Sequence, residues 1–257
     1  ALGLVWLIPF YLMLTNSFKT KQEIFTNPLK FPEAFTFENY PEAFRQLDFI
    51  RTLANSLLIT VSSVIIIVIF SAMAAYALER MKSKFSTVTF MVFIAAMLVP
   101  FQSVMIPLVA LFGKAQMLNQ IGIIFMYLGF GGSMSIFLYH GAMKSIPRAL
   151  DEAAIIDGAS RWQVFWKVIF PMLKPTTVTV AVLNTMWIWN DYLLPSLVIN
   201  SPTTQTIPLK MFFFFGQYTK QWHLALAGLV IAILPVIIFY FFMQKQIIKG
   251  VADGAVK

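Results

Sequence analysis

The chain lacks cysteine and has few ionisable residues for its length. Of its 257 residues 12% are charged, whereas soluble domains carry about 25%. The missing cysteine excludes disulfides, thiolate catalysis and thiolate metal sites. The two histidines, His140 and His223, lie far apart in sequence without a ligand cluster nearby, so we expect both to be structural. The chain also has no G-x-x-x-x-G-K-[ST] phosphate loop, so we do not expect it to hydrolyse ATP by itself.

Apolar residues dominate the composition. They make up 59% of the chain, and the mean hydropathy is +0.76. This balance is typical of a polytopic membrane protein, whose apolar surface faces lipid as well as a core. The formal net charge of +8 does not indicate nucleic-acid binding, because the cationic residues fall largely between the apolar runs, as in a chain anchored by cytoplasmic positive charge. We expect a lipid partner and no nucleic acid.

Six apolar segments predict an all-α fold with six transmembrane helices. They cover residues 1–14, 53–78, 88–112, 121–139, 176–199 and 224–243. The first is shorter than the about 20 residues that span a bilayer, so we expect its start to lie upstream; it does not resemble a signal peptide. Pro100 and Pro107 interrupt the third segment. Gly129, Gly131 and Gly132 lie in the fourth, where close helix packing is their expected role.

Basic residues in the short loops predict the orientation. Three regions rich in lysine and arginine alternate to one side, which we take as cytoplasmic: residues 79–84, the stretch between segments four and five, and the tail after residue 244. We therefore expect one transmembrane domain over residues 1–257. Within it we expect an ordered outer segment (18–51), a cytoplasmic loop (141–172) and a cytoplasmic tail (244–257). The outer phenylalanines 212–215 fit either the membrane interface or a partner surface.

The cytoplasmic loop has the pattern of helix, glycine turn and helix. Pro147 is a good first helical residue, and Asp157-Gly158 predicts a turn because glycine adopts positive φ. Ser160 and Gln163 have capping-box spacing at the start of a second helix. An apolar face is then predicted for that helix, made of Trp162, Phe165, Trp166 and Ile169.

The loop has two possible roles. An amphipathic hairpin could rest on lipid headgroups. Docking of another protein explains better why small residues lie beside carboxylates, since small side chains let a second surface approach closely. The loop residues concerned are Asp151, Glu152, Ala153, Ala154, Asp157, Gly158 and Ala159.

The same loop resembles that of binding-protein-dependent ABC importer permeases. The matching residues are Glu152-Ala153-Ala154, Asp157-Gly158-Ala159, Phe165, Pro171 and Pro175. The chain looks most like the maltose-type carbohydrate branch, and residues 31–40, 189–195 and 244–257 are also similar to that branch.

This resemblance implies a type I ABC importer permease in a prokaryotic cytoplasmic membrane. The seven loop residues from Asp151 to Ala159 would couple the chain to a cytoplasmic ATPase dimer, with Glu152 as a polar contact and Ala153 and Ala154 keeping the helix thin enough to enter a cleft. The other implied partners are a second, distinct permease subunit and an extracytoplasmic solute-binding protein. ATP and Mg²⁺ would bind the ATPase subunits, and this chain would bind no cofactor.

One polar group in the fifth segment could line a solute pathway. Asn184, Trp187 and Asp191 share one helix face, and Asn190 precedes the aspartate. Amides and carboxylates can hydrogen-bond hydroxyls, and aromatic rings can stack on sugars. An interfacial aromatic belt with polar groups at a helix break before Pro195 explains the pattern equally well.

Two other functional classes fit the sequence less well. An ion-coupled secondary transporter or channel without an ATPase should have polar residues clustered at the midplane of several helices, yet Glu79 and Asp191 stand alone. A membrane-embedded enzyme needs a catalytic or metal-binding constellation, and the sequence predicts no catalytic residue and no metal site.

Overall fold

The computed structural model is helical and contains no strand in the residues it describes, 5–215 and 221–255. The chain divides into two compact units. One comprises Ala1–Leu57 and Asn200–Phe242, and the other comprises Leu58–Ile199 and Met243–Lys257. Helices α5 (Phe49–Met81) and α15 (Trp222–Ala255) contribute to both units.

Three continuous helices in the described part are long and apolar enough to cross a membrane. They are α5, α8 (Gln120–Met143) and the Trp222–Lys245 portion of α15. They contain the second, fourth and sixth predicted segments, which are thereby confirmed as helices of spanning length.

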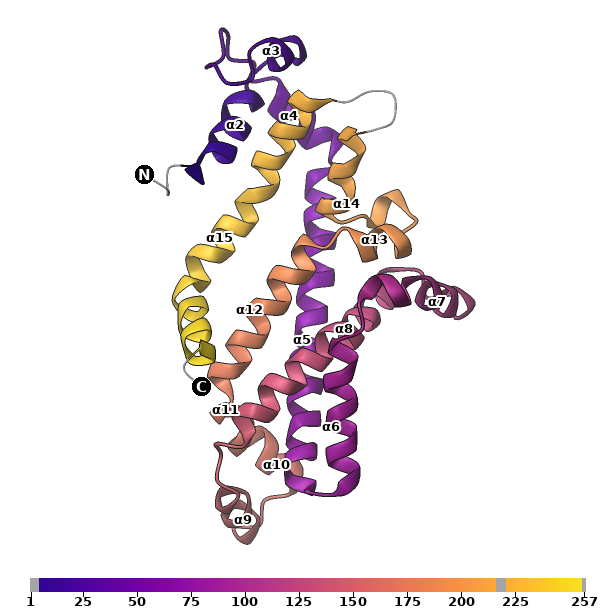
Figure 1. Cartoon of the computed structure of the whole chain (residues 1–257), viewed down its shortest axis with the longest axis vertical. Coiled ribbons are helices and arrows are strands. Elements are labelled where there is room, and N and C mark those ends of the chain that lie inside the picture. Colours follow the sequence, from indigo (N-terminus) through magenta and orange to yellow (C-terminus); the bar gives the residue numbers. More distant parts are fainter. Residues whose placement is uncertain (1–4, 216–220, 256–257) are drawn as a thin grey trace. The chain divides into compact units, whose positions relative to one another are not determined.

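Two further candidate spans are bent. Helices α6 (Lys84–Met97) and α7 (Phe101–Lys114) meet at 105°, and Figure 1 shows α7 turned away from α6. The break falls at Pro100, whose extended backbone precedes α7, whereas Pro107 lies inside α7. If each bent pair counts as one span, the described residues hold five candidate spans.

The second bent pair lies around the central loop. The helical stretch Arg161–Met172 meets α12 (Lys174–Asn190) at 76°. The predicted fifth segment covers most of α12 and then breaks at Asp191 before α13 (Leu193–Val198). The predicted helix break before Pro195 is therefore present.

The first predicted segment is only partly described, because residues 1–4 lie outside the described residues. Its described part enters α2 (Ile8–Ser17), a helix of 10 residues. That length is below the about 20 residues that span a bilayer.

Close contacts between α5, α8 and α12 build the core of the second unit. Ser71 of α5 donates a hydrogen bond to the Gly132 carbonyl of α8, and Asn184 of α12 donates one to Ser135 Oγ of α8 at 3.1 Å. At Gly131 an added Cβ would lie 2.4 Å from Asn184 Oδ1 and 2.7 Å from Ile67 Cδ1. The predicted packing role is confirmed at Gly131.

The predicted outer segment, residues 18–51, is folded. It contains α3 (Lys21–Thr26) and α4 (Asn39–Gln46). The Asn39 amide donates hydrogen bonds to the carbonyls of Ser17 and Lys19, both at 2.9 Å. The Lys19 ammonium is buried and donates to three oxygens nearby, and burial lowers the pKa of Lys19 from its ordinary value.

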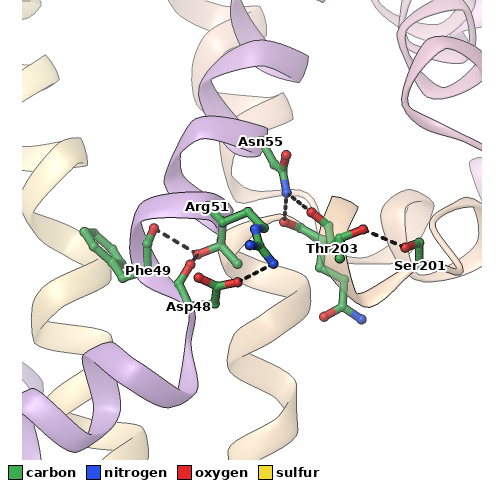
Figure 2. A network of polar contacts seen from close by, with 8 residues as sticks. Asp48, Phe49, Arg51, Asn55, Ser201 and Thr203 are labelled. Carbon is green, nitrogen blue, oxygen red and sulfur yellow. Dashed lines mark hydrogen bonds and ion pairs between the residues drawn. The ribbon is translucent and has the colours of Figure 1, made fainter.

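The first turns of α5 are joined to the segment that follows α13. Figure 2 shows Asn55 donating to the carbonyl of Thr203, at 2.9 Å, and a second bond runs to the Gln205 carbonyl at 3.0 Å. Close by, Arg51 pairs at 3.0 Å with Asp48, which lies in the turn just before α5, and about half of each side chain is exposed.

Short helices complete this region: η2 (Pro202–Thr204), α14 (Ile207–Met211) and η3 (Phe212–Phe215). Of the four phenylalanines in η3, Phe214 is buried and Phe212 and Phe213 are mostly exposed. Phe214 therefore packs inside the protein, and for the two exposed rings both predicted environments stay open.

Candidate functional site

The central loop contains α9 (Ala149–Ile156), which Figure 1 shows. A glycine cap ends this helix. Gly158 has φ +86°. The Gly158 N–H bonds the Ile155 carbonyl and the Ala159 N–H bonds the Ala154 carbonyl, both at 3.0 Å. These two bonds form a Schellman motif, which stops the helix sharply. The predicted glycine turn is confirmed.

The start of α9 differs slightly from the prediction. The helix begins at Ala149, two residues after Pro147. Pro147 and Arg148 instead accept turn-type bonds from the N–H groups of Leu150 and Asp151. Such tighter, 3₁₀-type turns are common at the N-termini of α-helices. Asp151 and Glu152 lie in the first turn, where the helix dipole favours negative charge.

The second part of the loop begins with the predicted capping box. Ser160 Oγ accepts from the Gln163 N–H, and Gln163 Oε1 accepts from the Ser160 N–H. The stretch then runs as α10 (Arg161–Val164), the π-helical turn η1 (Phe165–Ile169) and α11 (Phe170–Met172).

The predicted apolar face of this second helix is only partly buried. Phe165 and Ile169 are buried, whereas Trp162 is 59% exposed. The π-helical turn changes the residue period, so that a face drawn at regular α-helical spacing does not stay on one side.

The predicted coupling residues separate into two groups by exposure. Glu152, Ala153, Asp157 and Gly158 are exposed, and Ala154 and Ala159 are partly exposed. Asp151 is buried, and its side chain turns inward to Tyr76 and Arg80 of α5. The outer surface of α9 is extended by Ile155 and Ile156, which are 49% and 84% exposed. Large exposed aliphatic side chains beside small residues form a surface suited to a protein partner.

The carboxylate of Glu152 lies on this outer surface. Its nearest cation is Arg148, one turn earlier, at 3.6 Å, and both side chains are more than half exposed. An exposed pair of this kind contributes little stability, about 0–1 kcal/mol. The Glu152 carboxylate can therefore exchange this partner for another cation at low cost.

The predicted solute-pathway residues are partly brought together. Asn184 and Trp187 line one cavity of about 310 Å³ with Phe130, Gly131 and Leu183. Asn184 is buried and donates to Ser135 Oγ and to the Val180 carbonyl. The Trp187 ring is 42% exposed, which leaves an aromatic surface at this cavity.

Asp191 and Asn190 lie in different surroundings. Asp191 accepts a hydrogen bond from Tyr127 at 2.9 Å and caps α13 by accepting from the Leu193 N–H at 2.9 Å. The Trp187 ring packs edge-on against the same Tyr127. Asn190 is exposed, and its amide donates to the Met186 carbonyl within its own helix.

Three residues of this site were missed by sequence reasoning. Arg80 was counted only as an orienting charge, and Tyr76 and Tyr127 lie inside apolar runs. A tyrosine within a membrane segment is a usable signal, because a buried hydroxyl needs a partner. The partners themselves, 64 to 75 residues away along the chain, could not be named.

His140 fits the expected structural role. His140 pairs with Glu79 at 3.1 Å and stacks on Phe90. Within residues 5–215 and 221–255, no group of three or more histidines, aspartates and glutamates is arranged to hold a metal ion.

Known proteins resemble the chain over its full length. The model of the family "Binding-protein-dependent transport system inner membrane component" matches residues 67–253. A probable starch degradation products transport system permease protein of Thermoanaerobacterium thermosulfurigenes is 57% identical, over 100% of this chain and 93% of the relative. A multiple sugar-binding transport system permease protein of Streptococcus mutans is 36% identical, over 99% and 93%.

Solved structures agree with these sequence matches. A bacterial ABC transporter involved in the import of the acidic polysaccharide alginate matches with a TM-score of 0.79 and 25% identity, over 95% of this chain and 91% of that one. With the loop geometry and the membrane-length helices, these matches show that the chain belongs to the family of binding-protein-dependent transport system inner membrane components, and that it is a permease subunit of an ABC importer rather than an enzyme.

Proposed function

We propose that this chain forms half of the solute pathway of an ATP-driven importer for sugars or oligosaccharides. The carbohydrate assignment is supported by relatives whose names refer to starch degradation products, multiple sugars, and melibiose, raffinose and stachyose. The basic loops support a multi-pass arrangement in a prokaryotic cytoplasmic membrane, with α9 on the cytoplasmic side.

In this proposal α9 is the helix through which the ATPase acts on this chain. The single observation that carries it is the exposed surface of α9, where Glu152, Ala153 and Ile156 form a narrow face ended by the Gly158 cap. A cytoplasmic ATPase dimer would bind this face and hold ATP and Mg²⁺. This chain would bind no cofactor, and closure of the ATPase dimer would rock the membrane helices between inward-facing and outward-facing states.

Two further partners complete the importer. A second permease subunit, a distinct homologue, would form the other half of the pathway. An extracytoplasmic solute-binding protein would deliver the solute. One solved structure with the same fold is an alginate transporter in complex with its oligosaccharide-bound periplasmic protein.

The solute would pass the cavity that contains Asn184 and Trp187. An amide and a partly exposed indole can hydrogen-bond hydroxyls and stack on a sugar ring. Asp191 acts here through Tyr127, since its carboxylate is already engaged by that hydroxyl and by the cap of α13. Asn190, which is exposed, is the more peripheral member of the proposed pathway.

The test is ATP-dependent uptake by the reconstituted complex. Gly158→Pro should abolish uptake, because proline cannot adopt a φ of +86°, and the ATPase subunits should no longer co-purify. Gly141→Ala is the matched control, since an added Cβ there meets nothing within 4 Å. Normal uptake by Gly158→Pro would contradict the proposal. A panel of labelled oligosaccharides and amino acids then tests the solute class.

A further inference from the structure

The second half of α5 ends in a buried polar cluster that holds the central loop. Asp151 Oδ1 accepts hydrogen bonds from the Tyr76 hydroxyl at 2.7 Å and from Arg80 Nε at 3.2 Å. A second guanidinium nitrogen of Arg80 lies 2.8 Å from Asp151 Oδ2. Only 15% of the Arg80 side chain and 8% of the Asp151 side chain are exposed.

The same two residues of α5 contact the loop on both sides of α9. Arg80 donates to the carbonyl of Ile146, before α9, at 3.3 Å. The Tyr76 ring packs against Phe165, after α9, with the ring centroids 5.4 Å apart. The last turns of α5 thus contact the entry to α9, its first turn and its exit.

Asp151 is the only buried residue of α9. The helix otherwise presents exposed or partly exposed side chains. A buried charge is stable only while it is paired, so sliding of α9 against α5 would separate the two charges in a poorly solvated place. The pair therefore resists relative movement of these two helices.

We infer that Arg80 and Asp151 are positioning residues that make α9 and the adjoining end of α5 move as one body during ATP-driven transport. The inference rests on the proposed function of α9. The outer face of α9 contacts the ATPase, and the inner carboxylate passes that movement to α5, a helix of 33 residues. Arginine suits this task because its planar fork can bind a carboxylate through two nitrogens and still reach a carbonyl.

The experiment uses the complete complex with its ATPase and solute-binding protein in liposomes. It measures both solute uptake and ATP hydrolysis. In Asp151→Asn and Arg80→Gln, uptake per ATP hydrolysed should fall roughly twofold to thirtyfold, which corresponds to a change of about 0.5–2 kcal/mol in coupling. Both rates are expressed per amount of assembled complex, so that a loss of stability is separated from a loss of coupling. Arg80→Lys, which keeps the charge but not the fork, should recover part of the loss.

Arg51→Gln is the matched control. It makes the same change at the opposite end of α5, where the ion pair with Asp48 is exposed, and its uptake per ATP should equal that of the unaltered complex. A loss confined to coupling is not expected from a general weakening of the fold, which would reduce uptake and ATP hydrolysis together.

Tyr76→Phe keeps the inference testable if the stronger variants fail to assemble. It removes one hydrogen bond to Asp151 and leaves the ring beside Phe165, so an intermediate loss of coupling is expected. Unchanged uptake per ATP in Tyr76→Phe and in every Asp151 or Arg80 variant that assembles would overturn the inference. Failure of the unaltered complex to couple uptake to ATP would instead overturn the proposed function.

Discussion

Helix α5 carries an ion pair near each end, and the two pairs differ in almost every physical respect. Asp48, in the turn just before α5, and Arg51, in its first turn, are three residues apart, and about half of each side chain is exposed. Asp151 and Arg80 are 71 residues apart and largely buried. The first pair needs only the turn before α5 and the first turn of that helix. The second exists only when the central loop has folded back onto α5.

Because of this difference, the two pairs have different effects on stability and on the position of the helices. An exposed ion pair between residues close in sequence contributes about 0–1 kcal/mol and is screened by salt. A buried pair adds little net stability over apolar residues, but loss of one partner leaves an unpaired charge and costs about 3–5 kcal/mol. The buried pair is therefore a constraint on where α9 lies, whereas the exposed pair affects only the first turn of α5.

The largest effect is expected from truncating the buried pair on one side. Asp151→Ala should destabilise the protein by about 3 kcal/mol, because it leaves the Arg80 guanidinium without its carboxylate. The double variant Arg80→Met, Asp151→Leu should melt at a higher temperature than either of its two single substitutions, Arg80→Met or Asp151→Leu. Melting temperatures of the purified complex measure both. A double variant less stable than both single variants would show that the two sites do not interact.

The close packing of α8 against α5 and α12 at Gly131 is expected to be the next most sensitive to substitution. Gly131→Val should destabilise by about 1–3 kcal/mol, since overpacking forces neighbouring side chains to move and the added Cβ meets Asn184 and Ile67. Gly129→Val is the matched control, because an added Cβ there has no neighbour within 4 Å. The ratio of folded to aggregated protein in detergent measures the difference. Equal behaviour of the two variants would contradict the close packing at Gly131.

Local features of this molecule could be read from the sequence, and distant pairings could not. The Gly158 turn and the Ser160–Gln163 capping box involve residues within a few positions of one another, and both are present. The resemblance placed Asp151 among the coupling residues, but its inward direction depends on Arg80, far away along the chain. Helical spacing put Asn184, Trp187 and Asp191 on one face. It did not reveal Tyr127, which binds the Asp191 carboxylate and packs against the Trp187 ring.

The same distinction explains the bends. Pro100 and the stretch before Pro195 were recognisable as interruptions, because proline restricts its own backbone and that of the preceding residue. The size of the bend, 105° between α6 and α7, depends on packing that no local pattern encodes. The π-helical turn at Phe165–Ile169 has no proline or glycine to signal it, and it redirected the predicted apolar face.

A moderate effect on stability is expected at the neutral hydrogen bonds between α5 and the segment around Pro202–Thr204. Asn55→Ala removes two hydrogen bonds to backbone carbonyls and should cost about 1 kcal/mol, since a neutral bond contributes about 0.5–1.5 kcal/mol net. Asn190→Ala is the comparison, because its amide bonds the Met186 carbonyl within its own helix. Melting temperatures should fall further for Asn55→Ala. The reverse order would mean that the joint in Figure 2 is not a stabilising one.

The smallest effect is expected at the exposed pair, and its salt dependence is the sharpest contrast with the buried one. Arg51→Gln should change stability by less than about 0.5 kcal/mol in dilute buffer. That difference should vanish near 1 M salt, where the screening length is about 3 Å. Arg80→Gln should lose stability equally in dilute and concentrated salt, because ions do not reach a pair with so little exposed surface. Melting curves of both variants at the two salt concentrations measure this. A salt-dependent loss at Arg80 would show that water and ions enter the cluster around Asp151, and α9 would then be held to α5 by packing against Phe165 rather than by charge.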